Sequence, residues 1–369
     1  MKYAVIVLAN KQNPLSAVDF ESVTDAFLSG GVFLDEVIIL PYDAPSILNA
    51  HISRLSRECD GIFLVSDGAL VNSAREAINT FSGDGAFEGA VKETQSHIFG
   101  VIPSGKEGAD TVNADIVPRI DRRRNQRFCR IVLGVCAAPS ERIKSALSLA
   151  ERAAEGRLLL HASGKYGVTQ IEVIYNRDTP KMIADEVVRL LASELKEFLY
   201  TVGGDSLQQR LVDSLKLHRM KVSTAESFTA GGVGGAIVSV PGASAVFYEG
   251  INAYNERAKC ERLNVSATTL KERGAASDET AYEMAAGLLL EGNCDLAIAT
   301  TGIAGPDSDS SGAPKGMCYL AVGTKRRIRV YRHDILGDRE TVTKTAINFA
   351  LFHAYEEISD NFSSNHFKL

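Results

Sequence analysis

The sequence of 369 residues is 45% hydrophobic and 23% charged, and its formal net charge is −6. A chain of this length exceeds one typical hydrophobic core, so we expect two or three domains. The negative balance provides no general attraction for nucleic acid or anionic lipid, so we expect neither as a partner. No apolar run reaches the roughly 18 residues that cross a bilayer. The short run Tyr3–Leu8 predicts a first strand rather than a signal peptide.

Cysteine and histidine are scattered along the chain. The six cysteines include no C-x-x-C pair, and none of the seven histidines pairs with another at metal-ligand spacing. We therefore expect reduced thiols in a cytoplasmic protein, and chemistry that uses neither metal nor histidine.

The first predicted domain, residues 1–118, alternates strand-like and helix-like segments. Apolar residues at helical spacing predict helices at Asp19–Ser29 and Pro45–Leu55. Strand–helix alternation of this kind is typical of a parallel, doubly wound α/β sheet. The strands are predicted from runs rich in Val and Ile at Tyr3–Leu8, Glu36–Leu40, Gly61–Val65 and His97–Ile102.

A basic run follows the first domain. Residues 118–127 contain five arginines in ten positions. A nucleic-acid-binding segment is one interpretation, but the run has no aromatic residues on which bases could stack. We favour a solvated linker between domains.

A different pattern fills residues 128–200 and predicts a small α+β module. Its segments are a strand at Cys129–Val135, a helix at Ser140–Ala154, strands at Leu158–His161 and Gln170–Tyr175, and a helix at Pro180–Leu199. A domain boundary is expected at Gly203–Asp205. Ser206 and Gln209 then form a capping box that begins the helix of a third domain, residues 204–358.

Small and hydroxyl-bearing residues follow a predicted strand at Lys221–Ala225. The turn runs Glu226-Ser227-Phe228-Thr229-Ala230-Gly231-Gly232, and a helix is expected at Val233–Val240. Glycines let the backbone approach a ligand, and N–H groups at a helix N-terminus favour an anion or oxyanion. Helix capping by Ser227 or Thr229 is the structural alternative.

A second strand has the same design. Leu296–Ala299 is apolar, and it leads into Thr300-Thr301-Gly302-Ile303-Ala304-Gly305-Pro306. Ligands of open α/β sheets lie at the carboxyl ends of strands, so two such ends could bind a phosphate and a reacting carbonyl together. The alternative is that both segments are ordinary loops that follow a strand and bind no ligand.

Tyr254 and Lys259 form the third element. They are five residues apart, and a strand-to-helix junction between them would bring both side chains to one pocket. A serine nucleophile needs a base, which a desolvated lysine can provide. A solvated lysine is the commoner state.

Other segments of the third domain have structural interpretations. Ser277 is expected to cap a helix, residues 325–329 to form a hairpin turn that enters a strand, and Ile347, Leu351 and Tyr355 to line the apolar face of a C-terminal helix.

Five motifs occur in an order that resembles a known family. They are Thr224-Ala225-Glu226-Ser227-x-Thr229-x-Gly231, Val240-Pro241-Gly242-Ala243-Ser244, Gly250-x-x-x-Tyr254-x-x-x-Ala258-Lys259, Thr301-Gly302-Ile303-Ala304-Gly305-Pro306 and Gly337-Asp338-Arg339. From Gly204 to Ile358 the chain resembles the C-terminal domain of the competence-damage-inducible (CinA) family. The resemblance implies deamidation of nicotinamide mononucleotide to nicotinate mononucleotide and ammonia.

The resemblance also implies roles for individual residues. Ser227 becomes the nucleophile, Lys259 its base and Tyr254 a proton-sharing partner. It implies no cofactor for this domain, a pyridine nucleotide as ligand, and a homodimer or higher homo-oligomer. The residues implied to bind substrate are Thr229, Gly231, Thr301, Gly302, Gly305 and Arg339.

Upstream, residues 1–118 resemble a molybdopterin-binding domain and residues 128–200 a KH-like module. Residues 65–73 lack the glycine-rich stretch and the twin acidic residues that such a domain is expected to have, which makes it a degenerate version. Glu256, Lys315, Met317 and Thr343 depart from the usual residues of the third domain. The alternative function is therefore a non-catalytic nucleotide-binding or competence-associated assembly protein.

Overall fold

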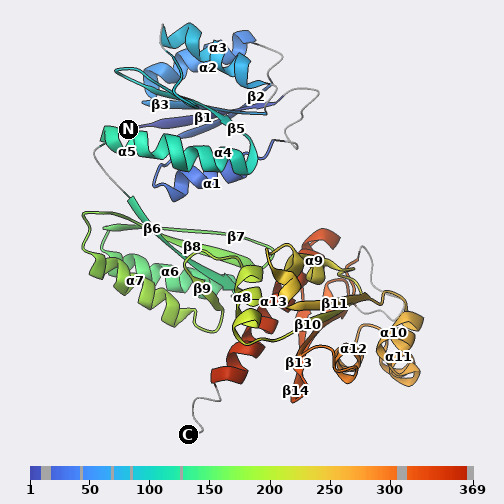
Figure 1. The fold of residues 1–369 in the computed structure, drawn as a ribbon. Helices are drawn as coiled ribbons and strands as arrows, with labels where there is room; N and C mark the ends of the chain where they lie inside the picture. Colours follow the sequence, from blue (N-terminus) through green and yellow to red (C-terminus); the bar gives the residue numbers. More distant parts are fainter. Residues whose placement is uncertain are drawn as a thin grey trace. The chain divides into compact units, whose positions relative to one another are not determined.

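The computed structural model describes residues 1–9, 18–41, 45–67, 70–83, 86–124, 128–305 and 314–363 (Figure 1). Pro306 of the fourth motif and the end of the arginine run lie outside these ranges. Two compact units make up the chain. One consists of Met1–Arg130, Glu151–Leu160 and Glu172–Val187, and the other of Ile131–Ala150, His161–Ile171 and Val188–Leu369. The three predicted domain ranges stay predictions.

A five-stranded sheet forms the centre of the N-terminal part, in the order β2-β1-β3-β5-β4. The strands β2, β1, β3 and β5 are parallel, and β4 is antiparallel to β5. The parallel α/β sheet predicted from the sequence is confirmed for these four strands. The bounds of the five strands are β1 Tyr3–Ala9, β2 Glu36–Pro41, β3 Gly61–Ser66, β4 Val91–Glu93 and β5 Ile98–Pro103.

Helices cover both faces of this sheet (Figure 1). One apolar cluster joins the sheet to α1, α4, a short π-helix and α5, and a second joins it to α2 and α3. This arrangement is doubly wound, as the strand–helix alternation predicts. The helices are α1 Glu21–Ser29, α2 Pro45–Glu58, α3 Val71–Ser82, α4 Gly105–Thr111, the π-helix η3 Val112–Ile116 and α5 Val117–Arg124.

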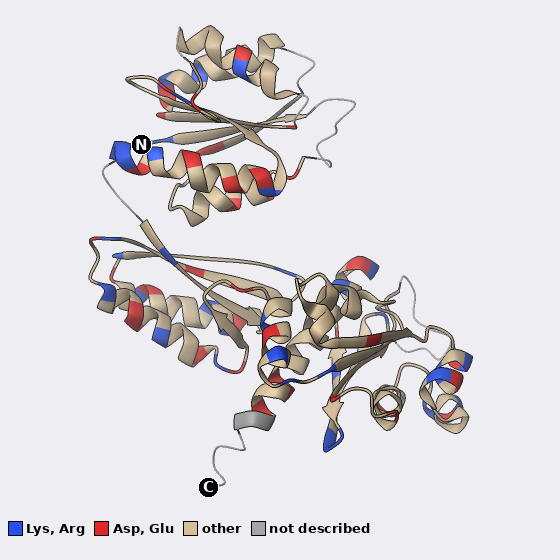
Figure 2. Cartoon of the chain, in the orientation of Figure 1, with Lys and Arg blue, Asp and Glu red and all other residues tan. Residues whose placement is uncertain are grey.

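The arginine run is not a linker in its described part, so that prediction is wrong. Residues 117–124 form α5, whose Ile120 is fully buried. Arg119 pairs with Glu88 at 3.2 Å and with Glu93 at 2.9 Å. Figure 2 shows basic side chains gathered at the end of α5, whose last turn contains Arg122, Arg123 and Arg124. The described part of the run is therefore a packed helix, with one buried side chain and an arginine paired with distant residues.

The middle of the chain contributes a four-stranded sheet in the order β7-β8-β6-β9. Its elements are β6 Phe128–Cys136, α6 Ser140–Ala154, β7 Leu158–Lys165, β8 Val168–Asn176, α7 Lys181–Glu194 and β9 Leu199–Val202. The sequence predicted helix up to Leu199, but the helix ends at Glu194. Residues 199–202 form a strand because they pair with β6, and this pairing buries Tyr200 and Thr201.

The C-terminal part is built on a sheet in the order β11-β10-β12-β13-β14. The strands β11, β10 and β12 are parallel, whereas β13 and β14 are antiparallel and form the predicted hairpin. The strands are β10 Val222–Glu226, β11 Phe247–Asn252, β12 Leu296–Gly302, β13 Met317–Thr324 and β14 Arg327–Asp334.

Helices again cover both faces. Apolar residues of α8, α9 and α13 pack against one face, and those of α10, α11 and α12 against the other. The side chains of Ser206 and Ser277 accept hydrogen bonds at the starts of α8 and α12, which confirms both as caps. The Gln209 side chain donates to Asp213 at 2.9 Å, so the structure bears out only the Ser206 half of the predicted capping box. The helices are α8 Leu207–Leu217, α9 Gly232–Val238, the 3-10 turn η4 Ala243–Ala245, α10 Glu256–Leu263, α11 Ala267–Arg273, α12 Asp278–Leu290 and α13 Arg339–Ser363.

The register of the parallel strands brings three loops together. Glu226, the last residue of β10, lies opposite Thr300 of β12 and opposite Asn252 of β11. The residues that follow these strands therefore meet at one edge of the sheet. Among the helices that the structure describes, none is both long and apolar enough to cross a membrane.

Candidate active site

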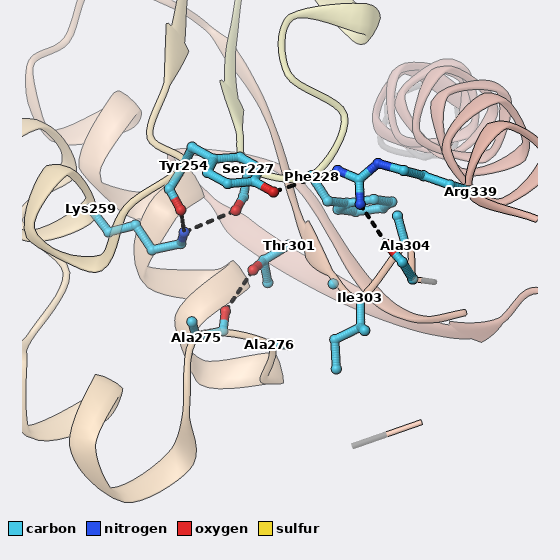
Figure 3. Close-up of a pocket in the computed structure, with 12 residues that line it drawn as sticks. Ser227, Phe228, Tyr254, Lys259, Ala275, Ala276, Thr301, Ile303, Ala304 and Arg339 are labelled. Carbon is cyan, nitrogen blue, oxygen red and sulfur yellow. Dashed lines mark hydrogen bonds between the residues drawn. The ribbon is translucent and has the colours of Figure 1, made fainter. Parts of the chain in front are cut away.

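A pocket of about 290 Å³ opens at this edge of the C-terminal sheet. Figure 3 shows its side chains converging from the loops after β10, β11 and β12 and from the start of α13. Two of the lining residues are cationic, Lys259 and Arg339, and none is acidic. The lining residues are Ser227, Phe228, Tyr254, Lys259, Ala275, Ala276, Thr301, Gly302, Ile303, Ala304, Gly305 and Arg339.

Ser227 lies directly after β10, where the sequence predicted a nucleophile or a cap. Its backbone N–H donates to the Thr300 carbonyl at 3.0 Å, which fixes the residue to the neighbouring strand. Its hydroxyl is not the cap of α9, because Gly231 holds the N-cap position and makes no side-chain hydrogen bond. The Ser227 Oγ instead accepts a hydrogen bond from Lys259 Nζ at 2.9 Å.

Lys259 is a buried lysine, only 1% exposed. It lies on α10, which begins after Asn255 caps the helix by accepting from the Arg257 N–H. The strand-to-helix junction predicted between Tyr254 and Lys259 is therefore present. Besides Ser227, the ammonium nitrogen donates to the carbonyls of Ala253 at 2.9 Å and Tyr254 at 3.3 Å.

The burial of Lys259 shifts its protonation equilibrium toward the neutral amine. Burial lowers the pKa of Lys259 below the ordinary value of a lysine, because the charged ammonium loses its hydration. The Glu256 carboxylate opposes this effect and raises the pKa of Lys259. Glu256 is exposed, so solvent screens its charge.

The three acceptors around the Lys259 nitrogen also determine where its lone pair points when the amine is neutral. A charged ammonium has three N–H groups, one for each acceptor. A neutral amine keeps two, which suffice for the carbonyls of Ala253 and Tyr254. The lone pair then faces Ser227 Oγ, the geometry that a general base requires.

Glu226 is a buried carboxylate that the sequence analysis did not select. Its Oε2 accepts hydrogen bonds from the Thr229 hydroxyl at 2.7 Å, the Gly231 N–H at 2.9 Å and the Val233 N–H at 3.0 Å. Its Oε1 accepts from the Gly234 N–H at 2.8 Å. The carboxylate therefore occupies the anion site at the N-terminus of α9 that the sequence assigned to a ligand.

Thr229 and Gly231 support the loop around Ser227 rather than line the pocket. The Thr229 hydroxyl is also 2.6 Å from the Thr300 hydroxyl, and Thr229 is buried. Gly231 has a φ of 91°, in the left-handed region that favours glycine. Neither residue lines the pocket, and the substrate contact predicted for them above stays a prediction.

Tyr254 and Arg339 meet at the mouth of the pocket. The hydroxyl of Tyr254 accepts from Arg339 Nη2 at 3.5 Å, and Arg339 Nη1 donates to the Gly305 carbonyl at 2.7 Å (Figure 3). Tyr254 thus contacts Lys259 through its backbone carbonyl, while its ring and hydroxyl face the opening. Its predicted proton-sharing role stays a prediction.

The loop after β12 forms the opposite wall. Thr301 is buried, and its hydroxyl donates to the Ala275 carbonyl at 2.5 Å. A side chain at Gly302 would collide with Cys318, whose Cβ would lie 2.5 Å from the added carbon. Thr301, Gly302 and Gly305 are all lining residues, as the sequence predicted, so the backbone of this loop is accessible to a ligand.

The four departures from the family pattern lie in different settings. Glu256 begins α10 and is exposed, as is Lys315, whereas Met317 is buried at the start of β13. Thr343 lies on α13, one turn after Arg339. Only Glu256 and Lys315 are charged, and both lie beside residues of the pocket.

Several pocket residues were not selected as site residues from the sequence, although some lie within its motifs. Phe228, Ala275, Ala276, Ile303 and Ala304 are apolar, and apolar residues in loops look like ordinary packing. In the ranges that the structure describes, no group of three or more His, Cys, Asp or Glu side chains is arranged to hold a metal ion.

Comparison with known proteins gives a consistent set of relatives. The CinA C-terminal domain model matches residues 204–358. A CinA-like protein of Kosmotoga olearia is 31% identical over 279 residues, which cover 72% of this chain and 66% of the relative. A CinA-like protein of Fusobacterium nucleatum is 35% identical over 176 residues, which cover 47% and 43%. The chain thus spans just under two thirds of the first relative and less than half of the second.

Among solved structures, a competence-damaged protein (CinA) superfamily protein of Klebsiella pneumoniae is similar at 30% identity. The match covers 42% of this chain and 96% of that chain, with a TM-score of 0.41. A competence/damage inducible protein of Agrobacterium tumefaciens matches at 34% identity over 39% of this chain and 89% of that chain, with a TM-score of 0.37.

Proposed function

Because the chain belongs to the CinA family, we propose that it is an amidohydrolase that converts nicotinamide mononucleotide to nicotinate mononucleotide and ammonia. The observation that carries this proposal is the hydrogen bond between Lys259 Nζ and Ser227 Oγ, 2.9 Å long and lying in a pocket. A serine and a buried lysine can act as a nucleophile–base pair, which is one way to hydrolyse an amide without histidine.

In the first half of the proposed reaction, Ser227 Oγ attacks the carboxamide carbon. Neutral Lys259 takes the hydroxyl proton as the bond forms, and a tetrahedral oxyanion results. When this intermediate collapses, Lys259 returns the proton to the leaving nitrogen and ammonia departs. The product is an ester between Ser227 and the pyridine carboxyl group.

In the second half, water attacks this ester. Lys259 removes a proton from the water and then protonates Ser227 Oγ as the carbon–oxygen bond breaks. Nicotinate mononucleotide leaves, and the serine hydroxyl is restored. Each proton taken by Lys259 is returned within the same half-reaction, so the enzyme ends in its starting state.

The loop around Ser227 supports this chemistry by its rigidity. The carboxylate of Glu226 holds Thr229, Gly231, Val233 and Gly234 by four hydrogen bonds. A fixed loop keeps the nucleophile in one position, which contributes to the rate of an intramolecular attack.

The direct test is an assay of the purified full chain with nicotinamide mononucleotide. We expect ammonia and nicotinate mononucleotide in equal amounts from the wild type and neither from Ser227→Ala. Mass spectrometry of a rapidly quenched reaction should detect the acyl group on Ser227. Binding of the nucleotide without any release of ammonia would instead identify a non-catalytic binding protein.

A further inference from the structure

Tyr166, in the turn between β7 and β8, contacts three residues of α13. Its hydroxyl donates to Glu340 Oε1 at 3.1 Å, and Lys344 Nζ lies 4.9 Å from the centre of its ring. Its backbone carbonyl accepts from Asn348 Nδ2 at 3.0 Å. The three positions on α13 are four residues apart, so they share one face of the helix. Tyr166 therefore follows this face of α13 over about two turns.

The backbone of Tyr166 has a conformation that aromatic residues rarely adopt. Its φ is 54°, in the left-handed region that glycine and asparagine adopt more readily. A residue stays in this region when the surrounding structure holds it there. Gly167 completes the turn and lies against α13, because an added Cβ would be 2.4 Å from Phe349 Cε1. The turn is thus fitted to α13, although its backbone favours a different residue at position 166.

The carboxylate that Tyr166 contacts is ionised. Hydrogen bonds from Lys344 and from Tyr166 lower the pKa of Glu340. Lys344 Nζ donates to the same oxygen as Tyr166, at 2.6 Å, so the three side chains form one connected group. Glu340 and Lys344 are exposed, and solvent therefore weakens each contact. The loss of the Tyr166 side chain should consequently have a moderate effect.

The first turn of α13 connects this contact to the pocket. Arg339 directly precedes Glu340, and its guanidinium donates to the Gly305 carbonyl and to the Tyr254 hydroxyl. Val342, on another face of the same turn, is fully buried in the apolar core. With Val342 packed in the core and Glu340 bonded to Tyr166, the start of α13 is held on two faces, and Arg339 keeps its two contacts.

We propose that Tyr166 is a positioning residue for the candidate active site, because it holds the start of α13 and thereby keeps Arg339 at the mouth of the pocket. The turn between β7 and β8 lies outside residues 204–358, which match the CinA C-terminal domain. The pocket thus depends on a segment outside that domain. Ser227 and Lys259 lie on other elements, so Tyr166 affects binding rather than the chemical step. The kinetic part of the test rests on the proposed function, whereas its hydrogen-exchange part does not.

Tyr166→Asn is the principal variant. Asparagine tolerates a positive φ, so the turn should form while the ring and hydroxyl contacts with α13 are lost. We expect KM for nicotinamide mononucleotide to rise about 2- to 5-fold, the effect of one partly exposed polar contact. The value of kcat and the pH at which activity rises should not change. The backbone amides of residues 342–349 should exchange their hydrogens faster than in the wild type.

Glu155→Asn is the matched control. Glu155 also has a positive φ, 49°, and also precedes a glycine, in the turn between α6 and β7. Its side chain pairs with Arg157. The control therefore makes the same change of backbone preference in a turn that is fitted to its own neighbours. It should leave KM and the hydrogen exchange of residues 342–349 at their wild-type values.

An unchanged KM in Tyr166→Asn, or an equal rise of KM in Glu155→Asn, would overturn the positioning role. If the wild type releases no ammonia, the proposed reaction fails, and hydrogen exchange decides whether Tyr166 holds the start of α13. Equal exchange of residues 342–349 in Tyr166→Asn and the wild type then refutes the role. Thermal unfolding shows whether Tyr166→Asn folds. If it does not, Tyr166→Phe takes its place, since it keeps the ring and loses only the hydroxyl, and the same outcomes decide.

Discussion

Lys259 Nζ lies 2.9 Å from Ser227 Oγ, although the two residues are 32 positions apart in the sequence. The parallel strands β10 and β11 bring them together, because Ser227 follows one and the segment that leads to α10 follows the other. The remaining neighbours of the Lys259 nitrogen are backbone carbonyls. The serine hydroxyl is therefore the only proton donor in contact with Lys259 Nζ among the described residues.

Replacing Ser227 with alanine should reduce deamidation at least about 1,000-fold, because the nucleophile is lost. The free energy of unfolding should change by less than about 1 kcal/mol, since the serine does not cap α9. Denaturant titration and the ammonia assay test the two expectations together. A variant that retains wild-type turnover would show that another group attacks the amide.

Replacing Lys259 with methionine should remove nearly all turnover. It should also remove the rise of activity with pH that we expect of the wild type. In the wild type, the lowered pKa of Lys259 predicts activity that rises with pH through a value below that of ordinary lysine. Between the folded and unfolded pKa values the unfolded chain binds more protons, so wild-type stability also rises with pH across that interval. Lys259→Met should lack both effects. A rate profile that is flat in the wild type would refute the serine–lysine mechanism.

In Glu256→Gln the rise of activity with pH should occur at lower pH than in the wild type. The Glu256 carboxylate raises the pKa of Lys259, so removing its charge lets burial lower that pKa further. Glu256 is exposed, so the shift should shrink as salt is added. Glu261→Gln on the same helix is the control, because Glu261 pairs with Arg257 instead. Equal shifts in the two variants would rule out a specific effect of Glu256.

Glu226→Gln tests the support of the Ser227 loop. A glutamine side chain has one acceptor oxygen, so it cannot satisfy the four donors that Glu226 receives. We expect a loss of about 1–3 kcal/mol in stability and a lower kcat. The pH at which activity rises should not change, because Lys259 and its hydrogen-bond partners are unchanged. If Glu226→Gln changes the pH at which activity rises, this carboxylate acts on Lys259 rather than on the loop.

Much of the site could be predicted from the sequence because it lies at strand ends. Ser227 and Thr301 each follow or end a predicted strand, Lys259 follows a predicted strand-to-helix junction, and ordered motifs supported the choice. Their convergence depends on which strands are neighbours, and parallel pairing makes carboxyl ends meet at one edge.

The features that were missed depend on contacts between distant or folded segments. Glu226 lies within a motif, but its four bonds exist only once the chain turns back at Ala230 and Gly231, both with positive φ. The helix α5 holds arginines whose partners, such as Glu88 and Glu93, precede it by 26 to 31 residues. Local periodicity contains no information about such partners.

The carboxylate of Glu226 has a consequence for how the site meets its ligand. In the protein without ligand, the N–H groups of Gly231, Val233 and Gly234 already donate hydrogen bonds to this buried carboxylate. Their hydrogen exchange should therefore be slow in the free protein and nearly unchanged when a nucleotide is bound. A loop in this state gives up little conformational entropy on association, so Ser227 is already positioned and the ligand alone must become ordered.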